Sequence, residues 1–288
     1  MYLGYLQLFI GWLKMHGVYI YFETIPPAHR SVILVLGLTF FWVLEYFIPF
    51  FQLEYNKWKH AGVNLFFTLT TILINLPLAF ILLKTSDWST ANDFGVLQWL
   101  SPMPLWGQIL LGTMILDFIG SYLAHWIEHK VKLLWGFHLI HHSDHKVDVT
   151  TANRHHPGES MLRFVFTCLG VLIVGAPVAL IMIYQALSVV LSQFNHANIS
   201  MSHKVDDLMS WIIVTPNMHK VHHHYKLPYT DSNYGNIFSI WDRIFGTYLK
   251  LSKDQIVYGV DTCPCEKENS IAATLLKLPF KSYKHPER

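Results

Sequence analysis

Histidines at helical spacing dominate the middle of this sequence. Fourteen of the eighteen histidines lie between His125 and His224. Three groups stand out: His125 with His129; His138, His141 and His142; and His219, His222 and His223. Residues three or four positions apart share one face of a helix. The spacing therefore predicts three helical faces, each of which presents two or three imidazoles.

Converging imidazoles favour a metal site. Without a metal they would crowd titratable rings whose pKa is ordinarily about 6.5, and these rings would repel one another when protonated. A metal removes this conflict because each ligating ring must be neutral. Structural zinc is satisfied by four ligands and usually includes cysteine, so eight or more imidazoles predict two metal ions. Imidazole binds iron, zinc, copper and nickel, so the ligand type does not select the element.

Two cations held by neutral rings also call for carboxylates that accept the second ring N–H. The carboxylates nearest in sequence are Asp117, Glu128, Asp144, Glu159 and Asp242, and an ordinary surface or capping role is the alternative for each. Asp117 lies two helical turns before His125, roughly on the same face. The Glu-x-x-His pairs of soluble di-iron bundles do not occur, which excludes that architecture.

The ordered motifs resemble those of the fatty acid hydroxylase/sterol desaturase superfamily of integral-membrane, histidine-rich di-iron oxygenases. The pattern is His-x3-His, then His-x2-His-His, then a second His-x2-His-His. Three further segments also resemble the family's sequences: Arg154-His-His156-Pro, Phe194-Asn-His196-Ala-Asn198, and the stretch from Asp231 to Tyr248. The resemblance covers roughly residues 105 to 250.

This resemblance implies two iron ions, which zinc could replace in a purified protein, and dioxygen as co-substrate. It implies metal ligands at His125, His129, His138, His141, His142, His219, His222 and His223, with His196 as a further ligand. His156, of the His-Pro motif, is an additional ligand candidate, and Asn198 is a weaker candidate for contact with the substrate or with a ligand. Some relatives carry another ligand one helical turn after the His196 position, where this chain has Ser200.

The composition indicates a membrane protein, since 52% of the residues are hydrophobic and only 14% are charged. Residues 31–51, 61–83 and 105–124 are apolar stretches of about 20 residues, enough to cross a hydrocarbon layer about 30 Å thick. Residues 161–192 are apolar around a break at Gly175-Ala-Pro177, which predicts a helical hairpin, with one long tilted helix as the alternative. We therefore expect an all-α integral membrane protein, with about three transmembrane helices, a hairpin, and a cytosolic helical cap that carries the histidine site.

Three regions are expected along the chain. We expect residues 1–30 to form an N-terminal interfacial helix, with a first membrane span as the alternative. Residues 31–250 would form the membrane and catalytic domain, and residues 251–288 a tail with an amphipathic surface segment.

Basic residues set the expected orientation in the membrane. The loop at 52–60 carries Lys57 and Lys59, the loop at 85–103 carries no Lys or Arg, and sixteen of the twenty-one basic residues follow residue 124. All three histidine groups should then lie on the cytoplasmic face. The third span runs directly into His125, so a lipid in the bilayer could reach the site.

The resemblance implies a multi-pass membrane monooxygenase that hydroxylates or desaturates a lipid: a fatty acyl, sterol-like or alkyl-ether lipid. No nucleotide-binding or flavin-binding glycine motif occurs, so electrons should come from a separate donor such as a ferredoxin, a reductase or a cytochrome b5 type protein. The net charge of +2 and the lack of a dense basic run indicate no nucleic-acid partner. The alternative is a non-catalytic membrane protein that binds or transports metal, although transporters place their ligands inside the spans.

Overall fold

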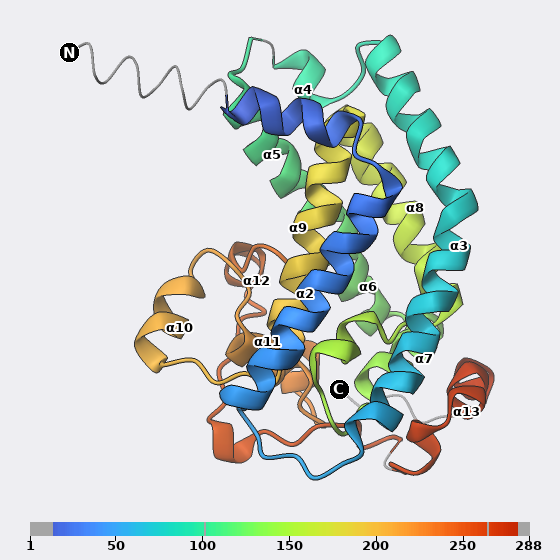
Figure 1. Cartoon of the computed structure of the whole chain (residues 1–288), viewed down its shortest axis with the longest axis vertical. Coiled ribbons are helices and arrows are strands. Elements are labelled where there is room, and N and C mark those ends of the chain that lie inside the picture. Colours follow the sequence, from blue (N-terminus) through green and yellow to red (C-terminus); the bar gives the residue numbers. More distant parts are fainter. Residues whose placement is uncertain (1–13, 101, 264, 282–288) are drawn as a thin grey trace.

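A computed structural model describes residues 14–281 except 101 and 264, and these residues form helices and loops without a β-strand (Figure 1). The long helices are α2 (Pro27–Phe47), α3 (Lys57–Ala91), α5 (Leu105–Asp117), α8 (Pro157–Val174) and α9 (Val178–His196). The short helices are α4 (Val96–Trp99), α6 (Ala124–Lys130), α7 (Lys132–His142), α10 (His203–Met209), α11 (Pro216–His222), α12 (Ile240–Ile244) and α13 (Ala272–Lys277). Single turns are the π-helical η1 (Phe118–Leu123) and the 3-10 turns η2 (Val149–Asn153), η3 (Tyr229–Asp231), η4 (Lys253–Gln255), η5 (Glu268–Ser270) and η6 (Leu278–Phe280).

The long helices are the membrane part of the protein. Five segments of the described chain are long and apolar enough to cross a bilayer: Pro27–Phe47, Lys57–Trp99, Leu105–Lys130, Pro157–Val174 and Val178–His196. Each has at least 18 residues, or about 27 Å of helix at 1.5 Å per residue. The all-α integral membrane fold predicted from the sequence is thus confirmed, although α3 runs beyond both ends of the predicted span 61–83.

The hairpin predicted over residues 161–192 is present as α8 and α9, and the alternative of one continuous helix is wrong. Gly175 ends α8 in the left-handed conformation, with φ of 69°, and Pro177 precedes the first turn of α9. The side chain of Ser86, near the far end of α3, donates to the carbonyl of Ala176 at 2.7 Å. Gln98 donates to the carbonyl of Gly175 at 3.1 Å. The tip of the hairpin therefore contacts the end of α3 and the short helix α4.

The third span leads straight into the histidine region, because α5, η1 and α6 follow one another without a gap. The π-helical turn η1 ends two residues before His125, and such turns are frequent at functional sites. Asp117, fully buried at the end of α5, accepts the backbone N–H groups of Ile237 and Phe238 at 3.2 and 3.1 Å. It also accepts the indole N–H of Trp241 at 3.0 Å. This carboxylate thus ties the span to a loop that is distant in sequence.

The first and last described segments, residues 14–23 and α13 with η6, lie at opposite ends of the molecule (Figure 1). A helical stretch at residues 14–23 crosses the end of the bundle near α4 (Figure 1). Residues 1–13 of the predicted interfacial helix lie outside the described residues, so its membrane placement stays a prediction, as do the region boundaries. At the other end, Leu275 and Leu278 of α13 and η6 pack against Trp135 and Leu139 of α7.

Replacing Gly175 with Ala should destabilise the protein. An added Cβ would lie 2.4 Å from the backbone oxygen of Phe94, and a left-handed φ disfavours any L side chain. We expect a loss of about 1–3 kcal/mol, seen as a lower midpoint of thermal unfolding in detergent. Gly62→Ala is the control: its Cβ would meet nothing within 4 Å, and Ala favours the helix. Equal midpoints for the two variants would contradict the close packing at the hairpin tip.

Candidate metal centre

Nine histidines from four helices converge at the end of the bundle away from α4. They are His125 and His129 of α6; His138, His141 and His142 of α7; His196, the last residue of α9; and His219, His222 and the adjacent His223 of α11. Each side chain is at most 6% exposed. These are the nine residues that the sequence suggested as ligands, and the fold brings all of them together.

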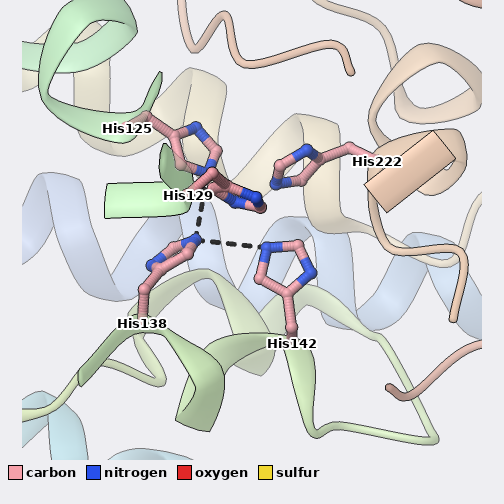
Figure 2. A group of neighbouring side chains, drawn as sticks. All are labelled: His125, His129, His138, His142 and His222. Atoms are coloured by element: carbon pink, nitrogen blue, oxygen red, sulfur yellow. Dashed lines mark hydrogen bonds between the residues drawn. The ribbon is translucent and has the colours of Figure 1, made fainter. Parts of the chain in front are cut away.

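The nine rings divide into two groups in which the ligand atoms lie within 4.8 Å of one another. The first group is His125, His129, His138, His142 and His222, drawn in Figure 2. The second group is His141, His196, His219 and His223. Either group could hold one metal ion. Adjacent residues of α7 and α11 go to different groups, so the two groups share these helices and lie side by side.

Local interactions fix the helices that carry the rings. Thr215 caps α11 by accepting the N–H of Met218, and Pro216 occupies the first helical position. The fully buried Arg154 donates from Nε to the carbonyl of Ile140, at the last turn of α7. This bond, 2.9 Å long, and a second from the Ser143 hydroxyl at 2.8 Å satisfy a carbonyl that has no backbone donor at the helix end.

The outer nitrogen of several rings is already engaged, which determines the tautomer. His125 donates from Nδ1 to the carbonyl of Tyr234 at 2.8 Å, and His138 donates from Nδ1 to Glu159 Oε1, also at 2.8 Å. In a neutral ring the other nitrogen, Nε2, must then carry a lone pair. Yet the Nε2 atoms of His125 and His138 face each other at 3.0 Å (dashed line in Figure 2). Two lone pairs at this distance repel unless a cation lies between them.

The same arrangement extends around the first group. His222 donates from Nδ1 to the carbonyl of Ser232 at 2.6 Å, and His129 Nδ1 lies 3.3 Å from Asp231 Oδ1. The Nε2 atoms of both rings are buried and have no hydrogen-bond partner among the described residues. His142 Nε2 is 3.2 Å from His138 Nε2. For metal–nitrogen bonds of about 2.0–2.1 Å, ligand nitrogens should be about 2.9–3.4 Å apart, so the observed spacing fits a shared ion.

The second group has four rings, and fewer of its outer ring nitrogens have hydrogen-bond partners. His196 donates from Nδ1 to the carbonyl of Ser192 at 2.7 Å, and its Nε2 lies 3.1 Å from His141 Nε2 and 3.0 Å from His219 Nε2. Among the described residues, the Nδ1 atoms of His141, His219 and His223 have no hydrogen-bond partner. The position at which some relatives carry a further ligand supplies none here: α9 ends at His196, and Ser200 is exposed, with its N–H bonded to the carbonyl of Ile48.

Burial favours the neutral form of these rings, which is the form that ligation requires. Burial lowers the pKa of His138 to about 3. Burial and, after it, the charge of neighbouring imidazoles hold the pKa of His142, His222 and His223 well below the usual value. At neutral pH these groups therefore keep the lone pairs that a metal needs.

Of the five carboxylates expected around the rings, Glu128 and Glu159 lie beside His138, and the other three do not contact a ring of either group. Glu128 Oε2 lies 3.7 Å from His138 Nδ1, and Arg163 bridges Glu128 and Glu159, with contacts of 2.6 and 3.0 Å. Asp117, Asp144 and Asp242 instead have other partners. Asp144 binds His60 and Thr151. Asp242 accepts the N–H groups of Tyr234 and Gly235 at 2.8 and 2.9 Å, so it orients the Tyr234 carbonyl rather than a ring.

Two weaker candidates lie apart from both groups. His156 caps α8: its Nδ1 accepts the N–H of Gly158 at 2.9 Å, and its Nε2 donates to the carbonyl of Leu276. Asn198 pairs with the backbone of Phe51 through both its side-chain atoms, at 3.0 and 2.9 Å. Asn198 therefore joins the end of α9 to the loop that follows α2.

Sequence reasoning missed two contributors. Asp231 contacts both His129 and Lys130, although the sequence marked it only as the first residue of the stretch that ends at Tyr248. His155 stacks on His141, with ring centroids 4.7 Å apart and planes at 16°, and its Nδ1 donates to Glu159 at 2.8 Å. His155 belongs to the Arg-His-His-Pro motif, but its spacing from the other histidines did not predict a role at the site.

The comparisons with known proteins agree with this site. Residues 109–247 match the fatty acid hydroxylase family model, and this range contains all nine rings. The ornithine lipid hydroxylase OlsE of Rhizobium tropici is 31% identical over 150 residues, which is 52% of this chain and 44% of that protein. The alkylglycerol monooxygenase of Homo sapiens is 31% identical over 177 residues, 60% of this chain and 36% of that protein. That of Danio rerio is 34% identical over 147 residues, 49% of this chain and 30% of that protein.

The chain therefore matches less than half the length of each of these relatives. No solved structure is significantly similar to it.

Replacing one ring of each group tests the ligand assignment. His222→Ala and His141→Ala should each lower the metal content of the purified protein from about two ions per chain to about one or fewer, because each group loses a lone pair. His203→Ala, an exposed histidine of α10, is the control and should leave the content unchanged. Unaltered metal content in both ring variants would refute their role as ligands.

A second test addresses the support of His138. Glu159→Gln keeps the shape of the side chain but removes the charge that accepts the ring N–H. Metal retention against a competing chelator should weaken by about 10–100-fold. Glu54→Gln, an exposed carboxylate, is the matched control. Equal retention in the two variants would show that Glu159 does not orient the ring.

Proposed function

Because residues 109–247 match the fatty acid hydroxylase family model, we propose that the chain is a membrane monooxygenase that hydroxylates a lipid with dioxygen and external electrons, at a centre of two iron ions. The observation that supports this most directly is the presence of two adjacent histidine groups, within each of which ring Nε2 atoms face one another. The overall reaction balances as R–H + O2 + 2 e⁻ + 2 H⁺ → R–OH + H2O. Zinc could occupy the same ligands in a purified protein.

The metal pair would supply the redox chemistry of dioxygen. The residues of this chain orient the ligand rings and exclude water from the site. Tyr234, Ser232 and Glu159 fix ring orientations from outside, while burial of all nine rings excludes water from between them. Exclusion of water protects a reactive centre from side reactions.

A lipid substrate is supported by the position of the site and by the relatives. The helix that begins at Leu105 in a candidate membrane span continues to Lys130 and carries His125 and His129. A molecule dissolved in the bilayer could therefore approach without crossing water. The named relatives act on an ornithine lipid or on alkylglycerols. A lipid with a long acyl or alkyl chain is the proposed substrate class, and an alkyl ether is included.

Electrons should come from a separate donor of the ferredoxin, reductase or cytochrome b5 type, because the sequence has no nucleotide-binding or flavin-binding glycine motif. We propose that this donor binds on the cytoplasmic face, where the distribution of basic residues would place the histidine groups.

Metal transport is a poorer explanation of the same site. A transported ion must be released, whereas these rings are buried and four of the five in the first group have an outer nitrogen bound to a carbonyl or carboxylate. Rings whose orientation is fixed by such hydrogen bonds favour an ion that stays bound over one that is transported.

Comparative lipidomics under isotopically labelled dioxygen tests the proposal. Cells that produce the protein should contain one lipid class with incorporated label that is absent from cells producing His222→Ala. The His203→Ala protein should behave like the unaltered one. If no lipid differs between cells with and without the protein, while the purified protein retains its metal, the oxygenase assignment fails.

A further inference from the structure

An apolar groove lies between α3, α7 and α8, beside the first histidine group. Its volume is about 450 Å³. Six apolar residues form most of its walls: Leu78, Leu134, Phe137, Met161, Leu162 and Val165. Met161 and Val165, at its rim, are 55% and 60% exposed, so the groove opens to the surroundings. Because α3 and α8 are candidate membrane spans, a groove between them would open to the hydrocarbon of the bilayer.

A glycine shapes the end of this groove near the site. The ring of Phe137 approaches the start of α8 so closely that a Cβ on Gly158 would lie 2.7 Å from it. Only glycine lets the aromatic wall of α7 meet α8 here. The groove is therefore bounded at this end by a close contact between two helices.

The inner wall of the groove is a carboxylate that contacts the first histidine group directly and the second through His155. Glu159 lines the groove and is only 1% exposed. Its Oε1 accepts from His138 of the first group and from His155, which stacks on His141 of the second group. Its Oε2 is buried and has no hydrogen-bond partner among the described residues. The groove therefore lies against a residue that orients a ring of the first group.

We propose that this groove binds one hydrocarbon chain of the lipid on which the metal centre acts, an inference that rests on the function proposed above. The walls provide no polar partner except Glu159, so a straight acyl or alkyl chain suits them and a polar molecule does not. The groove leads along α8, away from the rings. The bound chain is therefore held at a distance from the reacting carbon and positions it. Binding energy of this remote kind orients a substrate for reaction.

Photolabelling of the metal-loaded protein in phosphatidylcholine nanodiscs tests the binding site. The probe is a hexadecylglycerol ether with a diazirine in its chain, and unlabelled hexadecylglycerol is the competitor. Labelling of residues 158–165 and 134–137 should be saturable and displaced by the competitor. Labelling of lipid-facing residues of α3 such as Leu73 and Leu76 should not be, because these contact bulk lipid.

Two matched tryptophan variants make the test specific. Val165→Trp fills the groove from its rim, and Leu169→Trp places the same side chain one turn further along α8, at a residue that is 43% exposed and does not line the groove. Val165→Trp should lower the affinity of saturable labelling by about tenfold, and Leu169→Trp should not. In oxidation of hexadecylglycerol, Val165→Trp should raise KM while kcat changes less.

The outcomes separate the two proposals. Labelling that is not saturable, or that is equal in the two variants, overturns the groove as a chain-binding site. Saturable labelling with an unchanged KM in Val165→Trp overturns its role for the substrate. If the unaltered protein oxidises no lipid, the proposed function fails, and the labelling comparison still decides whether the groove binds a chain.

Discussion

The approach of imidazole lone pairs to one another is the constraint on which the rest of this structure depends. His125 and His138 each use Nδ1 for a partner outside the group, so their Nε2 atoms meet at 3.0 Å without a proton to share. A buried polar atom without a partner costs roughly 1–3 kcal/mol. Several such atoms would consume much of the roughly 5–15 kcal/mol that stabilises a typical fold. Bound cations would convert this cost into binding energy, so folding and metal binding should be coupled.

The fold supplies the outer partners through a series of contacts that begins in the membrane. Asp117, inside the third span, holds the backbone of residues 237 and 238, and Asp242 holds that of Tyr234 and Gly235. The loop so fixed presents the Tyr234 carbonyl to His125. These two carboxylates therefore act on the rings through the backbone. Direct carboxylate contact comes from Glu159 and Asp231, on α8 and in η3.

The helical spacing of histidines predicted eight of the nine converging rings, because side chains three and four residues apart must share a face, and the family resemblance added His196. Apolar length likewise predicted the spans, and the Gly175 break predicted the hairpin. The outer partners were harder to predict: Asp117 shares a helix with His125, but its carboxylate turns to residues about 120 positions away. Ser200 follows His196 by one helical turn only if the helix continues, and it does not, because residue 199 pairs with Pro49. The groove could not be predicted from the sequence, because its walls come from three separate helices.

The central claim is that the two groups of rings hold a pair of metal ions. X-ray absorption spectroscopy of the purified protein, measured at the edge of the metal that it contains, tests this most directly. The account predicts a first shell dominated by imidazole nitrogen at about 2.0–2.2 Å, with the outer-ring scattering typical of histidine and a second metal nearby. A protein without tightly held metal, or a first shell of sulfur or of water oxygen alone, would contradict the account.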